Sequence, residues 1–149
     1  MKHVFHSLSE AAAHFEPSAL TIGNFDGVHL GHRTLIHQAQ QIAFRHGWKT
    51  GVLTFDPHPT TLVAPERTPK MLCSLNERLD LLQQCGADQI LVLPFTAEVA
   101  AMGPEEFVRS IISETLQARA VVVGQNFRFG HRQAGDPEML ANLGVEAGF

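Results

Sequence analysis

Short apolar runs alternate with helical patterns along this chain, and the alternation constrains the fold more than any other feature. The runs have the length of buried strands and cover Ala19–Phe25, Thr50–Phe55, Gln89–Phe95 and Ala120–Gly124. When each strand is followed by a helix, the strands pair in parallel. Right-handed crossovers then place the helices over both faces of the sheet. We therefore predict an α/β fold whose ligands bind at the carboxyl edge of a parallel sheet.

Signals at helix ends locate the segments between these strands. One helix is expected from Leu30 to His46, with Gly47 as its stop. The other helices should begin at a capping-box pattern or at a proline, at Ser74–Glu77, Pro104 and Asp136–Pro137. The segment Lys2–Phe15 adds an edge strand and a short helix, because Ser7 and Glu10 repeat the capping-box spacing.

Size and charge limit the kinds of protein that this can be. A chain of 149 residues with 44% apolar content suits one globular domain over residues 1–149. The formal net charge of -4 argues against a nucleic-acid partner. No apolar run approaches the ~20 residues that cross a bilayer, and Cys73 and Cys85 form no short-spaced pair. We therefore expect a cytoplasmic protein without a membrane partner.

The segment Gly23–His32, with the sequence GNFDGVHLGH, carries the strongest chemical signal, and it runs from the first strand into the first helix. Its glycines permit close backbone approach, and the unpaired N–H groups at a helix start favour phosphate oxygens. His29 and His32 are three residues apart, which makes them neighbours on one helix face. The pair can place two imidazole donors against one phosphate chain and stabilise charge during a displacement.

The two histidines also have less specific interpretations. Two histidines near a helix start can simply cap it and face water. A zinc site is disfavoured because His29 and His32 lack the four-residue spacing of a helical zinc motif and no cysteine cluster completes a tetrahedral set, so we predict no metal site. The remaining histidines show no ligand spacing and are expected at the surface: His3, His6, His14, His37, His46 and His131.

Three separated segments together resemble the bacterial FAD synthetases, the bifunctional riboflavin kinase/FMN adenylyltransferases of the nucleotidylyltransferase superfamily. These segments are Gly23–His32, Phe55–Pro59 with the sequence FDPHP, and Val123–Gly130 followed by Gly135-Asp136. The resemblance covers the chain from Leu20 onward. It implies a Rossmann-like nucleotidylyltransferase fold that transfers AMP from ATP to FMN, giving FAD and pyrophosphate.

The resemblance also implies which residues form the site. It places His29 and His32, as the catalytic pair, on the ATP phosphates. It places further ATP contacts on Gly23, Asn24, Phe25, Asp26 and Gly31. It places FMN contacts on His58, Asn126, Arg128 and Phe129. Mg²⁺ accompanies ATP, and FMN and FAD are substrate and product.

The chemistry of the second and third segments agrees with that assignment in part. The Asn126 amide can donate and accept, Arg128 can pair with a phosphate, and Phe127 or Phe129 can cover a flavin ring. Loop phenylalanines can equally anchor a loop on the core, and His58 between two prolines can serve as a rigid turn residue.

The last residue, Phe149, stands where the fourth helix should lead into another strand. Members of the resembled family continue with that strand, an I-S-S-T/S-x-I-R segment and a separate riboflavin kinase domain, so we expect a C-terminally truncated domain. Two other functions stay open. The chain can be a nucleotidylyltransferase for another phosphorylated acceptor, such as phosphopantetheine, or a non-catalytic flavin- or nucleotide-binding module.

Overall fold

The computed structural model describes residues 3–56, 66 and 73–149. Within this part of the chain, five strands form one sheet in the order β1-β4-β3-β2-β5, and every neighbouring pair is parallel. The strands are β1 (His3–Phe5), β2 (Ser18–Ile22), β3 (Lys49–Asp56), β4 (Gln89–Pro94) and β5 (Ala118–Val122). The predicted parallel α/β sheet is confirmed.

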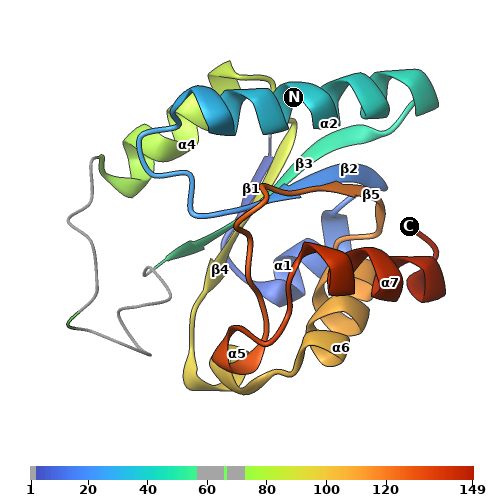
Figure 1. The fold of residues 1–149 in the computed structure, drawn as a ribbon. Coiled ribbons are helices and arrows are strands. Elements are labelled where there is room, and N and C mark those ends of the chain that lie inside the picture. The colour runs from blue at the N-terminus through green and yellow to red at the C-terminus, as the bar shows by residue number, and fades with distance from the viewer. Residues whose placement is uncertain (1–2, 57–65, 67–72) are drawn as a thin grey trace.

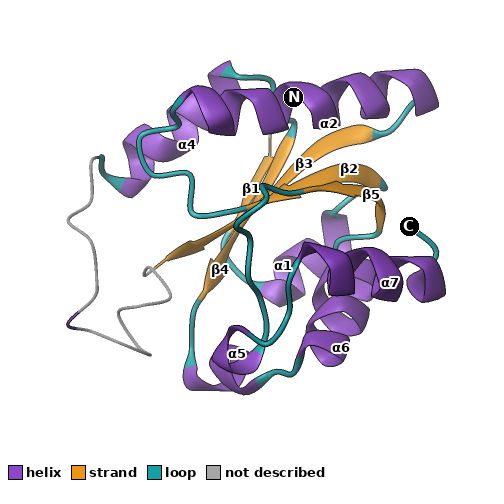
Figure 2. Cartoon of the chain, viewed as in Figure 1, coloured by secondary structure: helices purple, strands orange, loops and turns teal. Residues whose placement is uncertain are grey.

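Helices cover both faces of the sheet (Figure 1). One face carries α2 (Leu30–His46) and α4 (Leu75–Gln84). The opposite face carries α1 (Leu8–His14), α5 (Ala97–Ala101), α6 (Pro104–Glu106), η2 (Phe107–Thr115) and α7 (Pro137–Ala147). A short 3₁₀ turn, η3 (His131–Gln133), precedes α7. Figure 2 shows the sheet enclosed between these two helical layers. No helix in the described residues is long and apolar enough to span a membrane.

The helix ends follow the signals read in the sequence. Helix α2 begins and ends where predicted, and Gly47 closes it in the left-handed conformation with φ 72°. The hydroxyl of Ser74 accepts a hydrogen bond from the backbone N–H of Glu77. Ser7 caps α1 in the same way, and the Asp136 carboxylate caps α7.

Two strands and one helix depart from the prediction. Strand β2 ends at Ile22 because Phe25 adopts a left-handed φ of 54°, which an extended strand cannot contain. Strand β5 lies two residues earlier than expected. The helix after Pro104 changes from α to π geometry in η2, where the N–H of Leu116 donates to the carbonyl of Ile111, five residues earlier, at 3.0 Å.

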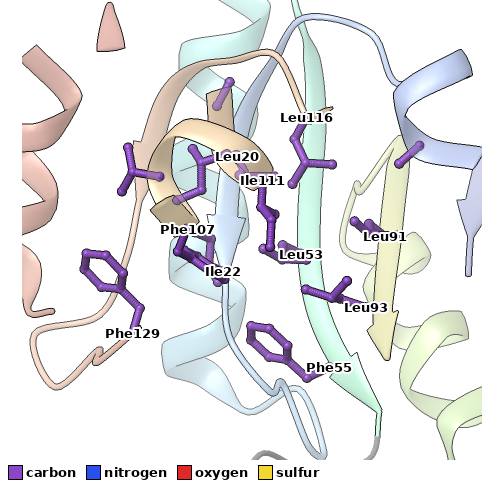
Figure 3. Close-up of a cluster of buried hydrophobic side chains, with 14 of the residues drawn as sticks. Leu20, Ile22, Leu53, Phe55, Leu91, Leu93, Phe107, Ile111, Leu116 and Phe129 are labelled. Carbon is purple, nitrogen blue, oxygen red and sulfur yellow. The ribbon is translucent and has the colours of Figure 1, made fainter. Parts of the chain in front are cut away.

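The core fills both faces of the sheet, because successive strand residues point in opposite directions. Towards η2 and α7, Leu53, Leu91, Phe107 and Ile111 belong to one cluster of buried side chains (Figure 3). On the other face, smaller residues and Phe25 pack beneath α2 and α4. The strands between these layers are therefore rigid supports for the loops that leave them.

The chain reverses its direction of winding at β2, which positions two loops at one edge. Strand β2 pairs with β3 on one side and with β5 on the other. The chain after β2 passes to α2 on one face, whereas the chain after β5 passes to α7 on the other (Figure 1). Ligands of open α/β sheets bind at such a switch point, outside the carboxyl ends of the strands. The loops 23–29 and 123–136 both begin there.

Candidate functional site

A strained turn carries the chain from β2 into α2. Phe25 (φ 54°) and Val28 (φ 44°) adopt left-handed backbone conformations that side chains with a Cβ rarely take. Both side chains are only 1% exposed, so their packing holds the backbone in place. Strain of this kind persists where the surroundings enforce it, and it is typical of functional sites.

Two imidazole rings lie together at the start of α2. His29 is the N-cap, and its Nδ1 accepts a hydrogen bond from the backbone N–H of Gly31 at 3.1 Å. The rings of His29 and His32 stack with their centroids 3.6 Å apart and their planes at 22°. His29 is exposed and His32 is half-buried, with the Phe25 ring edge-on at 5.0 Å. The two histidines are therefore neighbours as predicted, and the pair opens to solvent.

A hydrogen bond sets the tautomer of the neutral His29 ring, and burial sets the charge of the His32 ring. Because the Gly31 N–H points at Nδ1 of His29, the neutral His29 ring carries its proton on Nε2. Burial, and then the neighbouring His29, lower the pKa of His32 from 6.5 to about 4, against an opposing effect of Asp26. Nδ1 of His32 is buried without a hydrogen-bond partner among the described residues. His32 is thus neutral at pH 7.

We expect the His32 imidazole to titrate with a midpoint near pH 4 in NMR spectra of the protein without ligand. The folded pKa lies below the ordinary value of 6.5, so the unfolded chain binds more protons at this residue. Stability should therefore fall as the pH is lowered from about 6.5 to 4. His29→Ala should raise the His32 midpoint by removing the neighbouring ring. An ordinary midpoint in both proteins would contradict the burial of His32.

Asp26 and Cys73 tie the turn to the segment that precedes α4. The Asp26 carboxylate accepts from the backbone N–H of Cys73 at 3.1 Å and lies 3.4 Å from its sulfur. The backbone N–H of Gly27 donates to the same sulfur at 3.4 Å. Cys73 therefore supports the turn through its thiol, and both cysteines are free.

Arg78, which is not among the residues predicted from the sequence, supports the same turn from α4. Its side chain is buried, and its guanidinium donates to the carbonyl oxygen of Asn24 at 2.8 Å. A signal was present in the sequence. Arg78 lies in the apolar stripe of its helix, on the same face as Leu75, Leu79 and Leu82. A cation at such a position needs buried partners.

Phe129 anchors the second predicted loop, residues 123–136, to the hydrophobic core. This ring is 5% exposed and lies 5.8 Å from the ring of Phe107, and the ring of Phe127 stacks on it at 5.6 Å. Backbone hydrogen bonds in both directions pair Phe129 with Gly135. The geometry identifies Phe129 as the anchor of the loop. Contact of its ring with a flavin stays a prediction.

Asn126 and Arg128, the polar residues predicted on this loop, are both exposed. The Arg128 guanidinium donates to the adjacent carbonyl of Phe127 at 2.9 Å, and this is its one hydrogen bond within the described residues. His58, the remaining predicted FMN contact, lies outside the described residues. The residues predicted to contact ATP therefore lie together in the turn after β2 and the start of α2. Two of the residues predicted to contact FMN, Asn126 and Arg128, lie on the loop after β5.

The opposite edge of the sheet has a hollow of about 390 Å³, lined by Glu16, Pro17, Gly47, Trp48, Lys49 and Arg119. None of these residues belongs to the predicted site. Among the described residues, no group of three or more His, Cys, Asp or Glu side chains is arranged to hold a metal ion.

Comparison with known proteins identifies the family of this chain. The FAD synthetase family model matches residues 11–149. The bifunctional riboflavin kinase/FMN adenylyltransferase of Escherichia coli K12 is 38% identical over 144 residues, which are 97% of this chain and 45% of that protein. The protein of the same name from Listeria monocytogenes is 37% identical over 82% of this chain and 39% of its own length. The resemblance inferred from the sequence is confirmed, and the chain spans about half the length of the curated relatives it matches.

A solved structure shares the fold. A crystal structure described as a macrolide-efflux protein from Streptococcus pneumoniae superposes with a TM-score of 0.82 at 22% identity, covering 96% of this chain and 47% of that one. At this identity the likeness concerns the fold alone.

Proposed function

Because this chain belongs to the FAD synthetase family, we propose that it is an FMN adenylyltransferase unit, which transfers AMP from ATP to FMN and releases pyrophosphate. The observation that carries the proposal is the stacked pair of His29 and His32 at the start of α2. As in the bifunctional relatives, a separate riboflavin kinase domain of the whole protein would supply the FMN.

The reaction needs alignment more than a protein base. An oxygen of the FMN phosphate attacks the α-phosphorus of ATP, a new P–O bond forms, and the bond from the α-phosphorus to the leaving pyrophosphate breaks. A phosphate monoester with a second pKa of about 6 is already mostly dianionic at pH 7 and needs no deprotonation. The site must hold both anions in line and stabilise charge on the phosphoryl oxygens.

The turn and the helix start supply suitable groups. The Nε2–H of His29 and the neutral ring of His32 lie at the start of α2, where the helix dipole favours negative charge. Oδ1 of Asn24 and Nδ1 of His32 are buried without partners in the described part of the chain, which marks this turn as polar beneath its surface. Gly31 leaves room for His29, because an added Cβ would lie 3.0 Å from Cε1 of that ring.

Mg²⁺ would enter with the triphosphate of ATP and offset its charge. The chain's own part is to orient that complex through the imidazole pair and the helix start. The free thiols of Cys73 and Cys85 suit the cytoplasm, where cysteines stay reduced. The net charge of -4 favours small phosphate ligands held locally and disfavours nucleic acid.

Arg128→Ala is expected to raise KM for FMN about 10-fold or more and to leave KM for ATP unchanged, because a charge-assisted bond to the FMN phosphate is lost. Steady-state kinetics with each substrate varied would measure this. Arg119→Ala is the matched control, an exposed arginine at the opposite edge of the sheet. Equal effects of the two substitutions would remove Arg128 from the FMN site.

The direct test is to incubate the protein with Mg²⁺, ATP and one acceptor, and to measure the adenylylated product and pyrophosphate. FMN should give FAD, and riboflavin, which lacks the phosphate, should give none. Product with phosphopantetheine and none with FMN would reassign the acceptor. Binding of FMN and ATP without pyrophosphate release would leave only a binding module.

A further inference from the structure

Arg78 makes an unusual set of contacts for a residue in the apolar face of a helix. Its side chain is 2% exposed. A single nitrogen, NH1, lies 2.8 Å from the carbonyl oxygen of Asn24, 3.1 Å from the hydroxyl of Thr54 and 3.1 Å from the carbonyl oxygen of Phe55. The guanidinium of α4 therefore joins the turn after β2 to the end of β3.

The acceptors are connected to one another as well. The Thr54 hydroxyl donates to the carbonyl oxygen of Asn24 at 3.1 Å, so this one oxygen receives bonds from both side chains. Asn24 immediately precedes Phe25, whose backbone is left-handed and whose ring meets His32. The carbonyl that Arg78 binds thus belongs to the peptide group that joins Asn24 to Phe25, whose ring packs on His32.

A buried guanidinium here is costly for the fold. Nε of Arg78 is buried without a partner among the described residues, and the carboxylate of Asp56 stands 3.8 Å from NH2 with its side chain 51% exposed. An apolar residue would continue the stripe of α4 but would leave the carbonyl oxygens of Asn24 and Phe55 without this donor, so the arginine at this position is tied to the turn and to the end of β3.

We propose that Arg78 is a positioning residue, which holds the carbonyl of Asn24 and through Phe25 fixes the orientation of His32 for the ATP phosphates. The strained turn needs such a support, since a left-handed Phe25 persists only where its surroundings enforce it. The role in ATP binding rests on the function proposed above. The effect on His32 does not, because it can be observed without any ligand.

The test compares Arg78→Met, Arg78→Lys and the wild-type protein by NMR and by titration with Mg-ATP. In Arg78→Met, the His32 ring resonances should move and its titration midpoint should rise, because the ring loses its fixed place beside Phe25. The Kd for Mg-ATP should increase about tenfold, as expected if His32 loses one charge-assisted hydrogen bond to a phosphate oxygen. The Kd for FMN should stay constant. Arg78→Lys should restore part of both effects, because its ammonium can donate to the Asn24 carbonyl.

Leu116→Ala separates positioning from stability. Leu116 is fully buried on the opposite face of the sheet, so its loss should lower the unfolding temperature and leave the His32 resonances unchanged. If Arg78→Met does not fold, Thr54→Val removes the second donor to Asn24 without removing a charge, and it should shift the His32 resonances in the same direction.

Unchanged His32 resonances in folded Arg78→Met, or in Thr54→Val where Arg78→Met does not fold, would overturn the proposal. A shift of the same size in Leu116→Ala would overturn it too. Shifted resonances with an unchanged Kd for Mg-ATP would sustain the positioning of His32 and count against the proposed function, so the two failures are distinguishable.

Discussion

His32→Ala is expected to lower kcat for FAD formation by about 10²- to 10³-fold, as the loss of one preorganised hydrogen-bond donor does at other sites of charge development. The substitution removes a ring that stacks on His29 and faces the strained turn, and it leaves the helix backbone in place. Coupled measurement of pyrophosphate release under saturating Mg-ATP and FMN would give the value.

His37→Ala is the matched control, because His37 is an exposed histidine on the same helix outside the stacked pair. Its turnover and unfolding temperature should equal those of the wild-type protein. Unchanged turnover in His32→Ala, or a loss shared equally with His37→Ala, would remove His32 from the catalytic site. A circular-dichroism melt that stays close to that of the wild-type protein would show that the loss is not one of folding.

Phe129→Ala should lower the free energy of unfolding by about 3–5 kcal/mol, as the removal of a buried aromatic ring does in other cores. The ring packs on Phe107 and Phe127, and it holds the loop that presents Asn126 and Arg128. FMN binding should therefore weaken together with stability, whereas ATP binding should change little. Denaturant unfolding and flavin fluorescence titration would measure the two effects.

Phe44→Ala provides the comparison, since Phe44 is 88% exposed on α2 and its ring contributes no comparable burial. Its free energy of unfolding should stay within about 0.5 kcal/mol of the wild-type value. If Phe129→Ala were equally mild, the ring would not anchor the loop. A loss of FMN affinity at full stability would instead assign Phe129 to direct contact with the flavin.

Local signals predicted much of this fold because they report local physics. Helix α2 matches its predicted bounds since a glycine that tolerates a left-handed conformation, Gly47, marks its end. The capping residues Ser7, Ser74 and Asp136 were recognisable because each accepts from a backbone N–H three residues on. The neighbourhood of His29 and His32 followed from helical spacing in the same way.

Features that depend on tertiary packing could not be predicted from local pattern. The left-handed backbone of Phe25, which ends β2 early, is enforced by the burial of its ring under α2 and α4. The π geometry of η2 and the contacts of Arg78 arise likewise from elements distant in the sequence. The sequence showed the arginine in an apolar stripe, but its acceptors on β3 and the β2 turn emerge only in the folded chain.

A crystal structure of the protein with Mg²⁺ and a non-hydrolysable ATP analogue is the most direct measurement. If the imidazole pair holds the triphosphate, ring nitrogens of His29 and His32 will lie within about 2.7–3.2 Å of phosphate oxygens at the start of α2. A triphosphate bound elsewhere, such as in the hollow lined by Lys49 and Arg119, with both rings free of phosphate, would contradict the assignment of the pair.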